Sequence, residues 1–101
     1  MCQRFAYNER VIRSFRSKAL KRFAAKGDAS KLPVQNQDKV RRQLAALDAA
    51  TVPEDLDLPG YRFHGLEGEP KRYAVSVTGN YRLTWSWDEG DATDVDLEDY
   101  H

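Results

Sequence analysis

The apolar positions of this chain change their spacing close to its middle. Up to about residue 50 they recur every three or four residues, which is the spacing of one helix face, whereas from Tyr61 onward they alternate with polar residues, as in half-buried β-strands. This change predicts helices followed by a sheet. The 101 residues are enough for one domain with a modest core, so we expect a single α+β unit.

The first helix is predicted to begin after Ser17. Its hydroxyl can accept a hydrogen bond from a free backbone N–H of the first turn. The apolar stripe of this helix is Leu20, Phe23 and Ala24. Gly27 is expected to end it, because glycine readily adopts the left-handed conformation found at helix C-termini.

A second helix is marked by Val40, Leu44 and Leu47, which follow one another at i, i+4 and i+7. Together the two helices are expected to form an αα-hairpin. Residues 51–54, Thr-Val-Pro-Glu, are typical of a capping box on a single further turn. Residues 58–60, Leu-Pro-Gly, then interrupt regular structure before the strands begin.

Alternation predicts an opening strand at residues 11–15 and four antiparallel strands at residues 61–64, 73–77, 81–87 and 93–98. We expect the last three strands to form a meander, packed with the other strands into a twisted sheet against the helices. The predicted architecture is therefore an N-terminal strand and an αα-hairpin on an antiparallel sheet.

Two short connections join the last three strands. Gly79-Asn80 suits a two-residue type II′ turn, and residues 88–91 suit a longer hairpin loop. Alternation along the strand at residues 81–87 divides its side chains between the two faces of the sheet. We expect the helices to cover Tyr81, Leu83, Trp85 and Trp87, and we expect an open polar face with Arg82, Thr84 and Ser86.

Composition narrows the class of protein. The first thirty residues carry many Arg and Lys and no long apolar run, which argues against a signal peptide or a membrane span. The lone Cys2 cannot form an internal disulfide and is more readily interpreted as a bystander than as a nucleophile. We therefore expect a soluble, cytoplasmic protein with no membrane partner.

The net charge is zero, but the charges are divided along the chain. Residues 11–45 hold ten Lys or Arg and two acids, and residues 46–101 hold four Lys or Arg and thirteen acids. A positive helical face attracts polyphosphate through counterion release. Any nucleic-acid contact is therefore expected on one side only. The alternative is that each charged run is merely a solvated face.

The chain ends on Asp99, Tyr100 and His101, directly after an alternating run, so that a terminal imidazole carries the α-carboxylate. With the rest of the chain this ending resembles the HigB-type toxins of bacterial toxin–antitoxin modules, in the RelE/ParE superfamily. The pieces that carry the resemblance are residues 11–15, 47–51, 61–68, 80–83, 90–92 and 99–101. Residues 1–10 lie outside it, and we interpret them as an N-terminal extension, with Val11 as an alternative start of a single domain at residues 11–101.

The resemblance implies the RelE-like microbial RNase fold and a ribosome-dependent mRNA endoribonuclease that inhibits translation without a metal or other cofactor. It also implies a HigA-type helix-turn-helix antitoxin as partner, besides the ribosome and mRNA, with operator DNA contacted only through the antitoxin. Matched by motif position, the catalytic residues are His64, Arg82, Asp99, Tyr100 and His101. The expected RNA- and ribosome-binding residues are Lys18, Lys21, Arg22, Lys39, Arg41, Arg42, Lys71 and Arg72.

These residue types suit RNA cleavage by the ribose 2′-OH, which needs a base, an acid and positive charge. Histidine titrates near neutral pH and can serve as either acid or base. Asp99 and the terminal carboxylate favour an imidazolium, which makes His101 the expected acid and His64 the base. Arg82 would stabilise the phosphorane. Tyr100 would stack on a base or share proton transfer.

Strict alternation raises a difficulty for this assignment. It places Asp99 and His101 on the same side as Val95 and Leu97, opposite to Arg82, unless a bulge or a bend follows Leu97. A metal site built from His64, His101, Asp94, Asp96 or Asp99 is disfavoured, because no closely spaced ligand pair such as His-x3-His occurs.

One departure from the family pattern concerns Glu67, which stands where the family commonly places a lysine; Lys71 and Arg72 are candidates to replace that charge. The main rival interpretation is a catalytically attenuated module of the same fold, acting as antitoxin partner and transcriptional co-repressor. A gyrase-poisoning member of the superfamily is a further rival, disfavoured by the Asp-Tyr-His ending.

Overall fold

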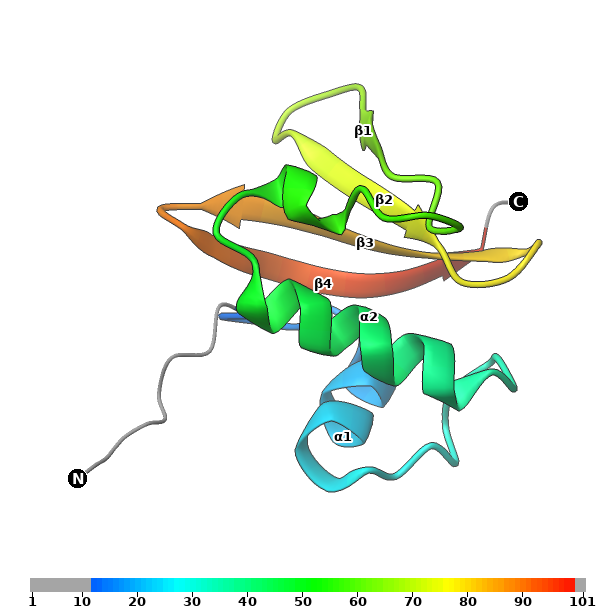
Figure 1. The fold of residues 1–101 in the computed structure, drawn as a ribbon. Coiled ribbons are helices and arrows are strands. Elements are labelled where there is room, and N and C mark those ends of the chain that lie inside the picture. Colours follow the sequence, from blue (N-terminus) through cyan, green and yellow to red (C-terminus); the bar gives the residue numbers. More distant parts are fainter. Residues whose placement is uncertain (1–11, 100–101) are drawn as a thin grey trace.

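Two helices, a 3-10 helix and a four-stranded antiparallel sheet make up the described part of the protein, residues 12–99 of a computed structural model. In chain order the elements are α1 (Lys18–Lys26), α2 (Gln37–Ala49), η2 (Pro53–Leu56), β1 (His64–Leu66), β2 (Arg72–Ser76), β3 (Tyr81–Asp88) and β4 (Asp91–Asp99). The strands lie in the order β1-β2-β3-β4, and the helices cover one face of the sheet (Figure 1). The predicted α+β class is confirmed. The proposed extension at residues 1–10, Cys2, Tyr100 and His101 lie outside the described residues.

Helix α1 begins and ends where the sequence predicts. The Ser17 hydroxyl oxygen accepts a hydrogen bond from the Leu20 N–H at 3.2 Å. At the other end Gly27 has φ 70°, and its N–H donates to the Phe23 carbonyl oxygen at 2.8 Å. Leu20 and Phe23 are both buried, so the predicted stripe faces the core.

Helix α2 is fixed to the sheet by a polar as well as an apolar contact. Asn36 caps it, because its side-chain oxygen accepts from the Lys39 N–H at 3.2 Å. Gln43 is fully buried, and its amide donates to the Ser76 carbonyl oxygen on β2 at 2.7 Å. The predicted apolar stripe is confirmed and buried: Val40, Leu44 and Leu47.

The single turn after α2 is present as η2, but the capping carboxylate is Asp55 rather than the expected Glu54. Asp55 Oδ2 accepts from the Thr51 N–H at 2.8 Å, from the Thr51 hydroxyl at 3.1 Å and from the Val52 N–H at 3.4 Å. These donors, the Thr51 N–H first, lower the pKa of the Asp55 carboxyl. The N-cap is Val52 rather than Thr51, so the N3 side chain that reaches back also lies one residue later than predicted.

The helix-covered face of the sheet holds the core. Leu83 and Trp85 of β3 are fully buried, and Trp85 lies 6.3 Å from Phe63 and 6.2 Å from Tyr73, measured between ring centroids. The predicted alternation of β3 is therefore confirmed on this side. No helix between residues 12 and 99 has the length and apolarity needed to cross a bilayer.

Strand β1 is displaced from its predicted position. It runs over His64–Leu66 rather than residues 61–64, because Arg62 has φ 54°, a left-handed conformation that interrupts an extended strand. The Tyr61 carbonyl oxygen still accepts from the Ser76 N–H at 2.7 Å. The segment therefore stays beside β2 before regular pairing starts.

Both hairpin turns differ from their predictions. Gly79 does not have the positive φ that a type II′ turn requires, so that assignment is wrong. Instead the Thr78 hydroxyl oxygen accepts hydrogen bonds from the backbone N–H groups of Asn80 and Tyr81. The connection at residues 88–91 is shorter than expected: Asp88 and Asp91 pair, and the two residues between them, Glu89 and Gly90, have φ 51° and 86°.

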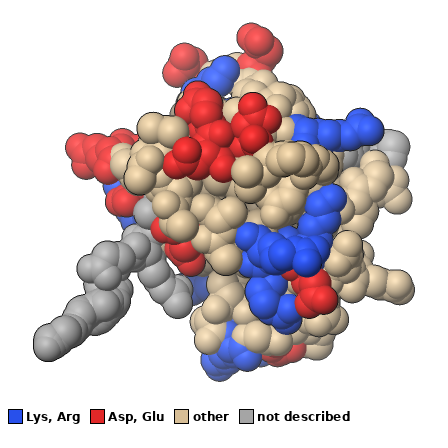
Figure 2. Space-filling view, viewed as in Figure 1, with Lys and Arg blue, Asp and Glu red and all other residues tan. Residues whose placement is uncertain are grey.

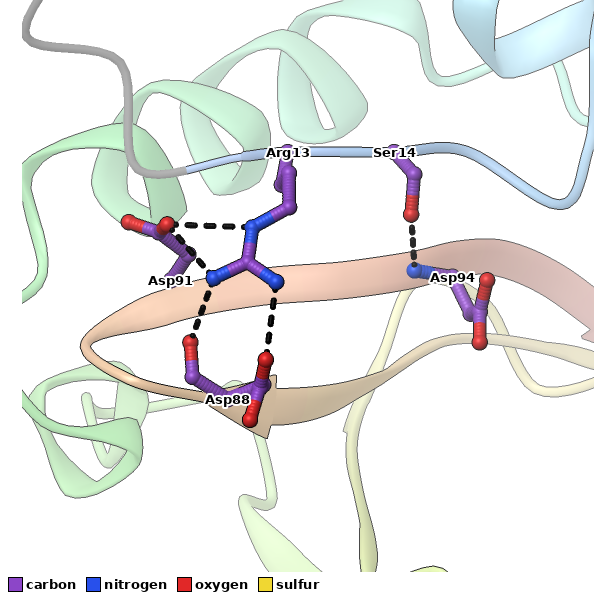
Figure 3. A network of polar contacts seen from close by, with 5 residues as sticks. All are labelled: Arg13, Ser14, Asp88, Asp91 and Asp94. Atoms are coloured by element: carbon purple, nitrogen blue, oxygen red, sulfur yellow. Dashed lines mark hydrogen bonds and ion pairs between the residues drawn. The ribbon is translucent and has the colours of Figure 1, made fainter.

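The opening segment lies along the outer edge of β4. It forms two parallel bridges, Ile12 to Ala92 and Phe15 to Val95, rather than the continuous strand that was predicted. The two bridge partners on β4, Ala92 and Val95, are three residues apart because β4 contains a bulge between them. From Thr84 to Ser86 β3 advances two residues, whereas the paired part of β4, from Asp96 back to Thr93, advances three. The extra residue is Asp94, at φ 51°, and its N–H donates to the Ser14 hydroxyl at 2.9 Å (Figure 3).

Candidate active site

The pairing of the strands places three polar residues on the sheet face that the helices leave uncovered: His64, Thr84 and Arg82. Residues directly opposed in an antiparallel sheet point to the same side. His64 opposes Ala74, and Ala74 opposes Thr84 on β3. Arg82 is two residues from Thr84, so it shares that side, and it opposes Glu98 on β4. His64 and Arg82 therefore lie on one face, as the catalytic assignment requires.

Glu98 lies between two guanidinium groups on this face. Its Oε1 is 3.9 Å from an Nη of Arg82, and its Oε2 is 3.8 Å from an Nη of Arg72. The hydroxyl of Thr84 donates to Oε2 at 2.7 Å. Both guanidinium distances exceed hydrogen-bond length, so the charges attract without a direct hydrogen bond. Glu98 is therefore shared by two guanidinium groups on this face.

Arg72 lies across the sheet rather than projecting from it. Its guanidinium donates to the hydroxyls of Ser86 and Thr84, each at 3.0 Å, and to the Asp94 carbonyl oxygen at 2.9 Å. The side chain is only 13% exposed, and burial lowers its pKa. It covers Thr84 and Ser86, which are buried, so the face expected to be open is partly closed by Arg72. Arg72 is thus placed to support the site more than to reach out to RNA.

His64 is exposed and its ring orientation is set by its own loop. Nδ1 lies 3.1 Å from the Arg62 carbonyl oxygen, which can only accept a hydrogen bond. In the neutral ring this contact assigns the proton to Nδ1 and leaves the lone pair on Nε2. A free Nε2 on an exposed imidazole is the arrangement that a general base needs.

Asp99 lies on the opposite face from Arg82. Leu97 opposes Leu83 and Asp99 opposes Tyr81, so the register runs unbroken to the end of the described chain. The β4 bulge lies upstream of Leu97 rather than after it, and it does not reset the parity in question. His101 and Tyr100 lie outside the described residues, so the structure brings together only His64 and Arg82 of the five predicted catalytic residues.

Comparisons with known proteins identify the family. Residues 13–101 match the model of the HigB-like toxins, described as the RelE-like toxin of type II toxin–antitoxin system HigB. The chain belongs to this family. It is 37% identical over 92 residues to Endoribonuclease HigB of Proteus vulgaris, covering 90% of this chain and 100% of that protein. It is 34% identical over 87 residues to Toxin HigB-1 of Vibrio cholerae, covering 83% and 92%.

Membership of the HigB-like family confirms the predicted resemblance and fold class. A type II toxin has an antitoxin as its partner, so that coarser part of the partner prediction also holds. Within residues 12–99, no three His, Cys, Asp or Glu side chains come together as a metal site.

The departure at Glu67 can now be located. Glu67 is exposed and directly follows β1, in the connection to β2. Lys71 does not lie beside Arg82: its Nζ is 5.9 Å from the Tyr73 ring centroid, and it lies close to Gly65, which opposes Tyr73. Lys71 is therefore on the Tyr73 side of the sheet. Of the two candidate replacements, only Arg72 is on the face with Arg82.

The basic side chains of the helices fall into separate groups. Lys18, Lys21 and Arg22 line an exposed hollow of about 470 Å³ on α1. On α2, Arg41 lies over the Phe23 ring at 5.4 Å and pairs with a neighbouring carboxylate. Figure 2 shows basic side chains over α2 and toward the β2–β3 hairpin, with an acidic group over η2. The remaining predicted RNA-binding residues of α2 are Lys39 and Arg42, half-buried and exposed respectively.

Sequence reasoning missed the contact network of Glu98. It assigned Glu98, with Asp94 and Asp96, to the outward face of the last strand, and this face is correct for Glu98. The link to Arg82 required the register of β3 against β4, and the link to Arg72 required a side chain that bends across the sheet. A signal was nevertheless present, because alternation put an acid and an arginine on the same face of the sheet.

Proposed function

We propose that this toxin is a metal-free endoribonuclease that cleaves mRNA on the ribosome. The observation that supports the proposal is the position of His64 and Arg82 on one uncovered face, with His64 Nδ1 in contact with the Arg62 carbonyl oxygen, so that Nε2 carries the lone pair of the neutral ring. The name of the Proteus vulgaris relative, an endoribonuclease, supports the same chemistry. No cofactor enters the proposed reaction.

In the proposed reaction, His64 is the base and Arg82 is the positively charged group. His64 Nε2 removes the proton of a ribose 2′-OH, and the 2′ oxygen attacks the adjacent phosphorus. The P–O5′ bond breaks as the new bond forms, which leaves a 2′,3′-cyclic phosphate. Arg82 offers two Nη groups to the phosphorane oxygens, where preorganised positive charge stabilises developing negative charge.

The leaving 5′ oxygen needs a proton, and His101 is the proposed donor. Its own α-carboxylate and Asp99 favour the imidazolium form. Tyr100 is proposed to stack on a base or to share proton transfer. Because Asp99 faces the helix side at its position in β4, the proposal requires His101 to act from around the end of that strand.

The basic helix surface is the proposed contact with the ribosome and mRNA. The predicted RNA-binding side chains of α1 and α2 suit an RNA backbone, and Figure 2 shows basic side chains over α2 that are separate from the acidic group over η2. The proposed antitoxin is of the HigA helix-turn-helix type, and operator DNA is contacted only through it. We propose that the toxin acts in the cytoplasm.

The test is to induce the toxin in cells and map new mRNA 5′ ends. Cuts inside translated codons are expected with the native chain, and they should disappear with His64→Ala or His101→Ala while the protein stays folded and soluble. Cuts outside translated regions would contradict ribosome dependence. Unchanged cleavage by His101→Ala would remove that residue from the mechanism.

A catalytically attenuated binding module is the second candidate, and Glu67 favours it. A carboxylate where the family commonly has a lysine weakens the positive potential around the scissile phosphate. If this is the cause of attenuation, Glu67→Lys should raise cleavage or growth arrest severalfold, measured by the same 5′-end mapping. Glu67→Gln is the matched control, since it removes the negative charge without adding a positive one; equal cleavage by all three proteins would exclude Glu67 as the cause.

A further inference from the structure

A polar pocket adjoins the candidate active site at the β2–β3 hairpin. Its volume is about 560 Å³. Lys39 of α2 and Arg62 of the loop before β1 line it from one side, and Ser76, Thr78 and Gly79 of the hairpin line it from the other. Its walls therefore come from three separate segments of the chain, which gives a concave surface rather than a lone surface charge.

Among residues 12–99, the two basic residues of this pocket have no carboxylate partner, and none of the acidic residues lines the pocket. Lys39 is also half-buried, which limits its access to bulk counterions. Uncompensated positive charge in a concave site favours an anion. Elsewhere in residues 12–99, five arginines lie within 4.0 Å of a carboxylate and Arg16 and Arg42 do not, so the pocket differs from these two in its concave shape; the five are Arg13, Arg22, Arg41, Arg72 and Arg82.

Thr78 adds a hydrogen-bond donor. Its hydroxyl oxygen accepts from the Asn80 N–H at 3.2 Å and from the Tyr81 N–H at 3.1 Å. A hydroxyl has one proton to donate, and here both of these contacts use its oxygen as acceptor. Its proton is therefore left to donate to an acceptor in the pocket, such as a phosphate oxygen.

Two lining residues of the pocket, Arg62 and Ser76, connect it to the candidate active site. Arg62 lines the pocket with its side chain, and its carbonyl oxygen engages His64 Nδ1. Ser76 lines the pocket and opposes Arg82 on β3. Two residues of chain span at most about 7 Å, so the Cα atoms of Arg62 and His64 are no farther apart than this. The left-handed backbone of Arg62, at φ 54°, is the kind of strained conformation that gathers at functional sites.

We infer that Lys39, Arg62 and Thr78 form a phosphate subsite for the RNA backbone beside the scissile phosphate. The inference rests on the proposed endoribonuclease function and specifies its substrate: a single strand whose neighbouring phosphodiester is bound. Holding that phosphate would place the 2′-OH near His64 Nε2 and the scissile phosphorus near Arg82, which is a contribution of position rather than of chemistry.

The test measures binding of a short 2′-O-methyl RNA, which cannot be cleaved, by fluorescence anisotropy over a range of salt. The variant is Lys39→Gln with Arg62→Gln, and the control is Lys26→Gln with Lys31→Gln, which removes the same charge from exposed positions elsewhere. The pocket variant should bind about tenfold more weakly, with a salt slope smaller by about 0.7, the value expected for one lost phosphate contact on a single strand. The control reports the effect of lost charge alone.

A chemical change in the RNA makes the test site-specific. Replacing one phosphodiester at a time by a neutral methylphosphonate should weaken binding of the native chain most at a phosphate next to the cleavage position. The pocket variant should lose nothing further with that same RNA. An additive loss would overturn the subsite, as would an equal loss in the control variant or no RNA binding by the native chain at low salt.

The outcomes also separate this inference from the proposed function. A His64→Ala variant should keep the affinity of the native chain for the 2′-O-methyl RNA and lose cleavage. RNA binding through the pocket by a protein that cleaves no mRNA would refute the nuclease and keep the subsite. Normal RNA binding by the pocket variant, with weakened binding of the antitoxin, would refute the subsite and identify the pocket as a site for an acidic protein segment.

Discussion

Two clusters of arginines and acids in this protein differ in how their charges are satisfied. Near the β3–β4 hairpin, Arg13 donates to Asp91 Oδ2 at 2.9 and 3.1 Å, to Asp88 Oδ2 at 2.8 Å and to the Asp88 carbonyl oxygen at 3.0 Å (Figure 3). On the uncovered face, Arg82 and Arg72 lie 3.9 and 3.8 Å from Glu98. The first cluster is exposed and closely hydrogen-bonded, whereas the second is more buried and more loosely paired.

This difference separates a structural contact from a site that can accept a ligand. Hydrogen bonds that Arg13 donates to Asp88 first, and then to Asp91, raise the pKa of Arg13, and its guanidinium connects the opening segment to the hairpin. The Arg82 guanidinium lies 3.9 Å from Glu98, which is too distant for a direct hydrogen bond between these two groups. A phosphate arriving at Arg82 can therefore form closer contacts than the carboxylate now makes.

The largest effect on cleavage is expected from replacing Arg82, with replacement of Arg13 as the comparison. Arg82→Ala should lower the rate of mRNA cleavage by about 10²–10³, the loss typical of one group that stabilises transition-state charge. Arg13→Ala should leave cleavage per folded molecule unchanged and lower the melting temperature, more so at low salt, because its ion pairs are exposed. Cleavage assays beside thermal melts would measure both. Comparable cleavage losses in the two variants would remove the distinction between the clusters.

A smaller effect is expected from Glu98. Glu98→Ala leaves the Thr84 hydroxyl and the largely buried Arg72 without their carboxylate, which should lower the free energy of unfolding by about 1–3 kcal/mol. Glu98→Gln keeps an acceptor for Thr84, so it should restore part of that loss. Denaturant unfolding of the two variants measures the difference. If Gln is as destabilising as Ala, the ion pairs matter more than the hydrogen bond.

The smallest expected effect concerns Asp55, a carboxylate held by N–H and O–H donors rather than by a cation. Because the Thr51 N–H and its neighbours lower the pKa of Asp55, the ionised form stabilises the fold above the carboxyl's ordinary pKa of 3.8. That contribution is lost as pH falls through the lowered pKa. Asp55→Asn should therefore melt below the native chain at neutral pH, and the gap should close in acid. A gap that persists at low pH would contradict this account.

The helices could be predicted from sequence because local residues determine their ends and their buried faces. Ser17 and Gly27 act through neighbours three or four residues away, and Leu83 and Trp85 follow strand alternation. Within the candidate site, alternation correctly predicted that Arg82 lies on the face that the helices leave uncovered. It also revealed that Asp99 belongs to the other face, which the register confirms.

Features that depend on distant residues could not be predicted in the same way. The β4 bulge occurs at Asp94, and because this residue is not a glycine, the sequence does not signal its left-handed backbone. The bulge is stabilised by Ser14, which lies near the other end of the chain. The bend of Arg72 across the sheet needs acceptors on two other strands. The orientation of His64 depends on the unusual backbone of Arg62.

The opening segment also decides where another chain could add to the sheet. By donating from Arg13 and Arg16 to carbonyl oxygens of β4, it occupies the backbone groups of that edge. Within residues 12–99, the opposite border is β1, which has only three residues. Such short borders offer little to a pairing strand. The protein is thereby protected on both sides against strand-by-strand self-association, and a partner is directed to its side-chain surfaces.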